Sequence, residues 1–398
     1  MSANPKKTET SQIDLQQDAL QMIPLIEGTE APCTNNSVDI KVSIIIPVYN
    51  TAEYLPQCLE SAINQTLKEI EIIVIDDAST DNSLQIIKHY ESLDDRIKVI
   101  AFEENQGNGY GRNEAIREAK GEYIMFLDSD DFLEYNAADL SYLKASYDQH
   151  DIVIYGHTSH YIDIRTEKVF TVECLPALND SDPNVFRYLM QQRKNLSCMP
   201  WQYFIKKNII FSNEIIFIEG IYFEDVIFTI KSIYFAKSIG IIKQSLYHYQ
   251  RRDGSITLSH SKKKIADMFT SLGIVKRFLE DKGIFNEYQR EYLIRFLMHG
   301  VCYNFIEYFK LPINYRDAEL SKYMYALRKS KIFRQENLLL LRLAITELAE
   351  DETRSKFYYI ECEKFLSALM YGYQIVWFNY KISHLILQLQ RFKHQIVA

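Results

Sequence analysis

From about Lys41 to Phe132 the sequence alternates short apolar strand patterns with helical patterns, and this alternation constrains the fold more than any other feature. The run 42–48 (VSIIIPV) is apolar at nearly every position, which is typical of a strand buried on both faces of a sheet. Further runs and helical patterns follow in turn: strands at 71–75, 97–102 and 122–127, and helices at 51–66, 81–90 and 109–119. Strands that alternate with helices over short links predict a parallel sheet with right-handed crossovers.

The rest of the chain divides by pattern. Residues 1–38 are polar without periodicity, so we expect a flexible N-terminal tail. We predict one α/β domain over 39–260, with a regular first half at 39–135 and a less regular second half at 136–260. Apolar residues at helical spacing then predict a helical C-terminal domain over 261–398. Further strands are expected at 151–155 and 239–242, and further helices around 286–309, 317–329, 336–349 and 354–394.

Charge and composition exclude some classes of protein. The formal net charge of -8 argues against a nucleic-acid binder, which needs a basic surface, but it is compatible with a nucleotide ligand. No two of the six cysteines form a CxxC pair, so we expect reduced, intracellular thiols rather than a zinc site of that type. The sequence shows no signal-peptide core and no apolar run near the roughly 20 residues of a membrane span. We therefore expect a cytoplasmic protein, and a peripheral contact with the inner face of the plasma membrane is compatible with this sequence.

Polar segments follow three of the predicted strands. These segments are Tyr49-Asn50 after the first strand, 76–81 (DDASTD) after the second and 128–131 (DSDD) after the fourth. The carboxyl ends of parallel strands meet at one edge of a sheet, where open α/β sheets bind their ligands. The sequence therefore predicts one ligand site built from all three segments.

The acidic segment 128–131 is a candidate metal site. Asp128, Asp130 and Asp131 lie within four residues and repel one another unless a cation is present. Mg²⁺ and Mn²⁺ prefer oxygen ligands and often join carboxylates to phosphates. A solvated acidic turn that caps the next helix is the alternative. The position of the segment after a buried strand favours the metal.

Two further segments carry candidate ligand contacts. We expect Asp77 to face the ligand and Asp81 to cap the following helix. Residues 107–113 (GNGYGRN) are glycine-rich, so their backbone can approach a ligand, and Arg112 can supply counter-charge among the carboxylates. The spacing matches no phosphate-binding loop, and a flexible loop with a structural arginine is an equally good interpretation.

Four segments, in this order along the chain, resemble the family-2 glycosyltransferases with the GT-A fold: VSIIIPVYNTAEYLPQCLESAINQT, IEIIVIDDASTDNS, GNGYGRNEAI and GEYIMFLDSDD. The resemblance implies a Rossmann-like, mainly parallel sheet that binds a nucleotide-diphospho-sugar donor with its first half and a saccharide or lipid-linked acceptor with its second. It implies a uridine pocket and donor contacts at Pro47, Tyr49, Asn50, Glu53 and Asp77. Asp128 and Asp130 match the family's DxD motif, which contacts the ribose and holds Mn²⁺ or Mg²⁺.

The second half of the domain resembles the same family less closely. Asp225 lies in a segment similar to the family's ED element, in which the aspartate is the general base that deprotonates the acceptor hydroxyl, and this implies inversion. Glu224 and Trp201 become candidate acceptor contacts by the same resemblance, and a core role is an equally good interpretation for Trp201. From the residue pattern alone, Glu224 and Asp225 would be negative charges that complement a helix N-terminus. Arg251 and Arg252 lie in a segment that closes over the diphosphate in capsule- and lipopolysaccharide-type members, and which of the two touches phosphate stays open.

The predicted function is sugar transfer to an acceptor hydroxyl during assembly of a cell-surface polysaccharide or glycoconjugate. A sugar nucleotidyltransferase is an alternative, but it would need a Gly- and Lys/Arg-rich loop after the first strand, where this chain has PVYNTAEYL. A non-catalytic sugar-binding scaffold is another alternative, and the joint presence of Asp77, Asp130 and Asp225 argues against it. The C-terminal helices could touch lipid or pair with a second subunit, since residues 381–393 form an amphipathic pattern.

Overall fold

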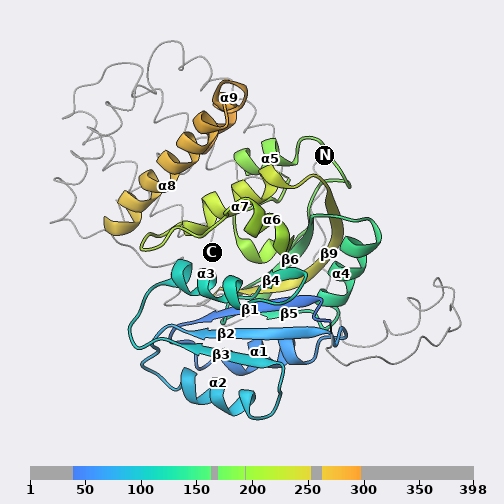
Figure 1. Cartoon of the computed structure of the whole chain (residues 1–398), viewed down its shortest axis with the longest axis vertical. Helices are drawn as coiled ribbons and strands as arrows, with labels where there is room; N and C mark the ends of the chain where they lie inside the picture. Colours follow the sequence, from blue (N-terminus) through green and yellow to red (C-terminus); the bar gives the residue numbers. More distant parts are fainter. Residues whose placement is uncertain (1–38, 163–168, 193, 252–261, 297–398) are drawn as a thin grey trace, which may run out of the picture. The chain divides into compact units, whose positions relative to one another are not determined.

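The computed structural model describes residues 39–162, 169–192, 194–251 and 262–296 (Figure 1). Its strands are β1 (Val42–Val48), β2 (Ile70–Asp76), β3 (Ile97–Ala101), β4 (Tyr123–Phe126), β5 (Phe132–Leu133), β6 (Ile152–Ile162), β7 (Val169–Cys174), β8 (Tyr203–Lys206) and β9 (Ile239–Gln250). Its α-helices are α1 (Leu55–Ile63), α2 (Ser83–Glu91), α3 (Asn108–Glu118), α4 (Ala137–Tyr147), α5 (Val185–Gln191), α6 (Lys207–Ser212), α7 (Glu224–Phe235), α8 (Lys262–Asp281) and α9 (Phe285–Arg295). The strands form one sheet in the order β3-β2-β1-β4-β8-β6-β9-β5, and β7 pairs with β6.

The first half of the sheet is parallel, as the strand and helix patterns predict. β1 pairs in parallel with β2 and β4, and β2 pairs in parallel with β3. Every residue of β1 and β2 is buried, because helices cover both faces of this part of the sheet. Right-handed crossovers place α1 and α2 on one face and α3 on the other (Figure 1). The predicted bounds of these elements agree with the structure to within a few residues.

The second half of the sheet is mixed, and its antiparallel pairs join the parallel first half to a further parallel pair. β8 runs antiparallel to both β4 and β6, and β5 runs antiparallel to β9. β6 and β9 are parallel, with a register shift around Gly156. A Cβ at Gly156 would lie 3.0 Å from the carbonyl oxygens of Cys174 and Gln244, so the backbone packs tightly at this shift. An apolar strand pattern does not specify strand direction, and this explains why the sequence did not predict the mixed part.

Two helices after residue 261 pack against the second half of the sheet domain. α8 contacts α7, and α9 contacts α5. On α8 four of the residues predicted at helical spacing are buried, Met268, Leu272, Val275 and Leu279. The helix predicted at 286–309 begins as α9, whereas the helices predicted from residue 317 onward and the predicted N-terminal tail lie outside the described residues. The boundary near 260 stays a prediction. Among the helices that are described, none is long and apolar enough to cross a membrane.

Candidate active site

The loops after β1 and β2 are joined directly at the carboxyl edge of the sheet. The Asp77 N–H donates to the carbonyl of Val48 at 2.9 Å. Asn50, in a left-handed conformation with φ 53°, accepts from the Thr80 N–H on its Oδ1 at 2.7 Å. Its own N–H donates to Ser79 Oγ at 3.1 Å. The predicted convergence of these two segments is therefore present, and Asn50 connects them.

Side chains around Asn50 differ in their accessibility. The Tyr49 side chain is 44% exposed at the end of β1, which leaves an aromatic face open to a ligand. Glu53 is exposed as well, whereas Pro47 is buried within β1. A direct ligand contact is therefore geometrically open to Tyr49 and Glu53 and closed to Pro47 in this conformation.

Asp77 has a structural role that the sequence did not indicate. Its two carboxylate oxygens accept from the backbone N–H groups of Gln106 and Gly107 at 2.7 and 2.8 Å, and the residue is 4% exposed. Asp77 thus holds the loop before α3 instead of simply facing a ligand. The Asp81 side chain caps the start of α2 as predicted, because its Oδ1 accepts from the N–H of Ser83, the first residue of the helix, at 2.9 Å. The residue directly before the helix is Asn82, whose side chain makes no capping hydrogen bond. Asp81 also accepts from the Ala52 N–H in the loop after β1.

The three carboxylates of the acidic segment have distinct environments. Asp128 accepts from Arg112 at 2.7 Å. Asp131 is 1% exposed and accepts from the Tyr247 hydroxyl at 2.6 Å and the Gln250 N–H at 2.7 Å. Burial, together with the charges of Asp130 and Asp128, raises the pKa of Asp131 well above its usual value. Asp131 therefore anchors β9, a role that its neighbourhood in the sequence did not reveal.

Asp130 lies between these two residues and is partly buried. Its backbone carbonyl accepts from Gln250 Nε2 at 3.0 Å. The segment is also tied to the loop after β1, because the hydroxyls of Thr51 and Ser129 are hydrogen-bonded at 2.9 Å. The loops that follow β1, β2 and β4 thus form one connected edge.

Arg112 links this edge to the second half of the domain. It is 4% exposed, and its guanidinium pairs with Asp128 at 2.7 Å and with Glu224 at 3.0 Å. The predicted counter-charge among the carboxylates is therefore present. The glycine pattern serves packing: a Cβ at Gly109 would lie 2.9 Å from the carbonyl of Ile218. Gly109 to Asn113 are helical residues of α3, not a flexible loop.

The first turn of α7 carries two acidic residues beside Arg112. The chain enters this helix through Phe223, which takes a left-handed conformation with φ 64°. Burial, reinforced by the charge of Glu224, raises the pKa of Asp225 to about 7. Burial also raises the pKa of Glu224. Asp225 retains some exposure, so near neutral pH it can exchange a proton with a ligand in the site.

Trp201 is not available to stack on a sugar, and the prediction of an acceptor contact is wrong for this conformation. The side chain is 2% exposed. Its ring stacks on Tyr247 with centroids 4.3 Å apart, and its edge meets His157 at 4.9 Å. Trp201 therefore belongs to the core beneath β9, and its apolar neighbours in the sequence could not separate that role from sugar binding.

Of the two arginines that follow β9, the described residues include Arg251. Arg251 is exposed, and its N–H donates to the carbonyl of His160 at 3.1 Å. Arg252 lies outside the described residues. The preceding His248 is hydrogen-bonded to Glu134 and His160 at 2.8 and 2.9 Å. Which arginine contacts a diphosphate stays a prediction.

Comparison with known proteins identifies similar chains. The model of the family described as "Glycosyl transferase family 2" matches residues 43–210. Glycosyltransferase GlyG of Streptococcus pneumoniae serotype 4 is 33% identical over 226 residues, which cover 54% of this chain and 72% of GlyG. A cholesterol galactosyltransferase of Borreliella burgdorferi is 30% identical over 302 residues, covering 73% of this chain and 81% of that protein. The crystal structure of S. aureus TarS aligns with a TM-score of 0.55 at 19% identity over 81% of this chain and 55% of TarS, a likeness of fold.

Proposed function

Because the chain belongs to glycosyl transferase family 2, whose members transfer sugars and share the GT-A fold, we propose that it uses a nucleotide-diphospho-sugar donor and an acceptor hydroxyl. The observation that carries this proposal is the linkage of Asp128, Arg112 and Glu224 beside Asp225. It joins the nucleotide-binding edge of the sheet to an aspartate whose pKa is raised to about 7. The base and the leaving group of one reaction can therefore meet in one site.

We propose that the nucleoside of the donor is uridine. Tyr49 offers an exposed ring for stacking, and Asn50 and Glu53 lie exposed next to it. Asp77 is buried and fixes the loop before α3 through the N–H groups of Gln106 and Gly107, and this loop would line the donor site. Pro47 contributes through the backbone of β1. Arg251 or Arg252 would supply a guanidinium fork, which suits a diphosphate.

The acidic segment fits a divalent cation. Asp128 and Asp130 offer hard oxygen ligands, and their negative charges contribute to the raised pKa of Asp131. Asp130 would hold Mn²⁺ or Mg²⁺, with Asp128 beside it near the ribose. When bound, the ion stabilises the negative charge that grows on the departing nucleotide diphosphate. Arg112 holds the Asp128 carboxylate in place through an ion pair at 2.7 Å.

Asp225 would act as the general base. An acceptor hydroxyl loses its proton as it attacks the sugar, and a carboxylate with a pKa near 7 is well matched to accept that proton. Glu224 is held by Arg112 and would orient the acceptor or shape its subsite. A base opposite the leaving group implies a single displacement with inversion. We infer this stereochemistry from the family resemblance and the position of Asp225.

The proposed setting is cell-surface polysaccharide or glycoconjugate assembly on the cytoplasmic side of the membrane. The acceptor would be a saccharide or a lipid-linked saccharide. A peripheral membrane contact and a homo-oligomer through the C-terminal helices are part of this proposal, and the residues concerned lie outside the described ranges. GlyG and the cholesterol galactosyltransferase are glycosyltransferases in their own organisms, and we propose no acceptor for this chain from their names.

A panel of UDP-sugars tests the proposal and separates an enzyme from a scaffold. We expect Mn²⁺-dependent release of UDP from one or more donors by the unaltered protein, and loss of this release in Asp130→Ala. Binding of UDP-sugars without any release of UDP, with or without saccharide acceptors, would favour a binding scaffold. Formation of the nucleotide-sugar from a nucleoside triphosphate would favour a nucleotidyltransferase.

A further inference from the structure

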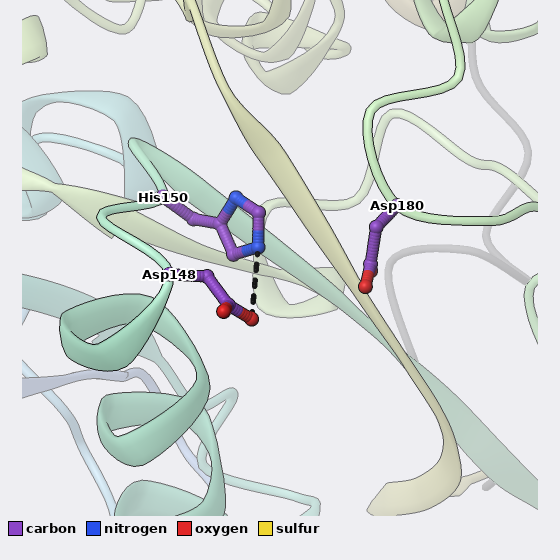
Figure 2. Close-up of side chains that lie close together, drawn as sticks. All are labelled: Asp148, His150 and Asp180. Atoms are coloured by element: carbon purple, nitrogen blue, oxygen red, sulfur yellow. Dashed lines mark ion pairs between the residues drawn. The ribbon is translucent and has the colours of Figure 1, made fainter.

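A separate group of potential ligands lies away from the acidic segment, at the end of α4. Asp148 and His150 come from the turn between α4 and β6, and Asp180 comes from the segment between β7 and α5 (Figure 2). One carboxylate oxygen of each aspartate and one ring nitrogen of His150 all lie within 4.8 Å of one another. We call this group the Asp–His–Asp cluster.

His150 is oriented as a metal-binding histidine would be. The residue is 5% exposed, and its Nδ1 is hydrogen-bonded to Ser238 Oγ at 2.7 Å. Its Nε2 is buried and has no hydrogen-bond partner among the described residues. That atom is directed at the carboxylates and lies 3.5 Å from Asp148 Oδ2 (Figure 2). When His150 carries its proton on Nδ1 and donates it to the Ser238 hydroxyl, the lone pair of Nε2 is available to a ligand, as in many metal sites.

A cation already occupies part of the cluster. The Lys144 ammonium lies 2.8 Å from Asp148 Oδ2 and 2.6 Å from Asp180 Oδ2, and its side chain is 24% exposed. It pairs with both carboxylates, offsets one of their two negative charges and leaves His150 Nε2 without a hydrogen bond. An ion that accepted all three ligands would satisfy the buried nitrogen and release a flexible lysine to solvent.

We propose that the Asp–His–Asp cluster is a second metal site, which takes Zn²⁺ or a similar late first-row ion in competition with Lys144. The imidazole nitrogen and the carboxylate oxygens are atoms that Zn²⁺ takes as ligands, the imidazole favours it over Mg²⁺, and water would complete the site. Ligand atoms of a tetrahedral zinc site are about 3.3 Å apart, as follows from zinc–ligand bonds near 2.0 Å. The 3.5 Å between His150 and Asp148 already fits, and Asp180 needs a small approach. The bound ion would join the α4–β6 turn to the segment around Asp180, whose Oδ1 also accepts from the Ile241 N–H.

Titration of the full chain with Zn²⁺ in excess Mg²⁺ tests this proposal, because Mg²⁺ fills oxygen-only sites and competes poorly for imidazole. We expect Lys144→Met to bind Zn²⁺ at least about tenfold more tightly than the unaltered protein, since the competing ammonium is gone. We expect Asp180→Asn, which keeps the acceptor for Ile241, to bind at least about tenfold more weakly. Asp139→Asn on the same helix is the matched control and should leave the affinity unchanged.

Co²⁺ provides a spectroscopic reading of the ligands. In Lys144→Met we expect visible absorption typical of low-coordinate Co²⁺, and we expect it to vanish in the double variant Lys144→Met/His150→Gln at unchanged circular dichroism. Asp130→Ala should retain the Zn²⁺ affinity, which separates this site from the proposed catalytic ion. Equal Zn²⁺ affinity in all variants, absence of Zn²⁺ binding by Lys144→Met, or loss of Zn²⁺ binding in Asp130→Ala would overturn the proposal.

Discussion

At the level of single residues, aspartates that look alike in the sequence have different chemistry in the structure. Asp131 is buried against Tyr247, and its pKa is raised well above the usual range. Asp128 is paired with Arg112. Asp225 has a pKa of about 7 because it is buried beside a second carboxylate. Each role depends on which partner the fold brings to the carboxylate.

Asp225→Asn is expected to retain donor binding and to lower kcat by roughly 10²- to 10⁴-fold, the usual contribution of a general base. In the unaltered enzyme, kcat/KM should rise with pH to a plateau above about pH 7, since Asp225 must be ionised to accept a proton. UDP release and product formation across pH 5–9 measure both effects. Normal transfer by Asp225→Asn would place the base elsewhere.

The same substitution should stabilise the fold at alkaline pH. The raised pKa means that Asp225 ionises near pH 4 in the unfolded chain and near pH 7 in the folded one. Its contribution to stability is therefore present below about pH 4 and is lost as the pH rises to about 7. Asp225→Asn removes this loss. The free energy of unfolding of the variant, measured in urea relative to that of the unaltered protein, should therefore grow from pH 5 to pH 8 by on the order of 1 kcal/mol. A constant difference over this range would contradict the raised pKa.

Arg112→Met is expected to destabilise the fold by about 3–5 kcal/mol, because it leaves the carboxylates of Asp128 and Glu224 without their shared cation. Arg112→Lys should lower the free energy of unfolding by a smaller amount, but the stability should stay below that of the unaltered protein, since one ammonium cannot reproduce the guanidinium fork. Arg117→Met on the exposed side of the same helix is the control, with an expected change below about 0.5 kcal/mol. Urea unfolding gives all three values, and equal changes for Arg112→Met and Arg117→Met would disprove the bridging role.

At the level of secondary structure, α8 holds the loop that leads into the first turn of α7. Asp267 accepts from the Tyr222 N–H at 2.9 Å, and Lys263 donates to the carbonyl of Gly220 at 2.7 Å. Ser271 Oγ donates to the carbonyl of Phe223, the left-handed residue before Glu224, at 3.2 Å. A helix from the C-terminal region thus positions the backbone beside the proposed base.

Asp267→Ala is therefore expected to lower kcat by roughly tenfold with little change in the KM for the donor, because a misplaced base affects the transition state more than the bound donor. Asp267→Asn keeps an acceptor for the Tyr222 N–H and should restore most of the activity. Glu280→Gln, in an exposed pair with Lys276 farther along α8, is the matched control. Steady-state kinetics with varied donor measure the split, and full activity of Asp267→Ala would rule out this positioning role.

At the level of the whole molecule, the site forms where the two halves of the domain meet. The first half contributes Asp128 and Asp130 at the edge of the parallel strands, and the second half contributes Asp225 on α7. Arg112 forms ion pairs with Asp128 of the first half and with Glu224 of the second half. Donor binding should therefore stabilise the assembled domain and not only one loop.

A preferred UDP-sugar at about 100 times its Kd, with Mn²⁺, should add about 2.7 kcal/mol of stability, which raises Tm by roughly 4 °C. EDTA should remove most of this shift, and GDP-sugars should give a smaller one, because the proposed pocket is suited to uridine. Thermal unfolding monitored by fluorescence measures each condition, with Asp130→Ala as the reference for metal-independent binding. A shift of the same size in the presence of EDTA would contradict metal-assisted binding.

The amino-acid sequence by itself determined the parallel half of the sheet and the identity of its ligand-binding edge. Apolar runs such as 42–48 specify buried strands through local pattern, and strand ends in a parallel sheet must converge. Their position after a buried strand made Asp128 and Asp130 candidate ligands from local pattern, whereas Asp225 was identifiable only through the resemblance to the family-2 glycosyltransferases.

Only the tertiary structure decided which carboxylates pair, which are buried and which side chains are accessible. The contacts Arg112–Glu224, Asp131–Tyr247 and Tyr222–Asp267 join residues 112, 116 and 45 positions apart, and no local pattern records such contacts. The direction of β8 and the burial of Trp201 were undetermined for the same physical reason. Charge state and exposure are properties of long-range packing, and the pKa of Asp225 follows from that packing.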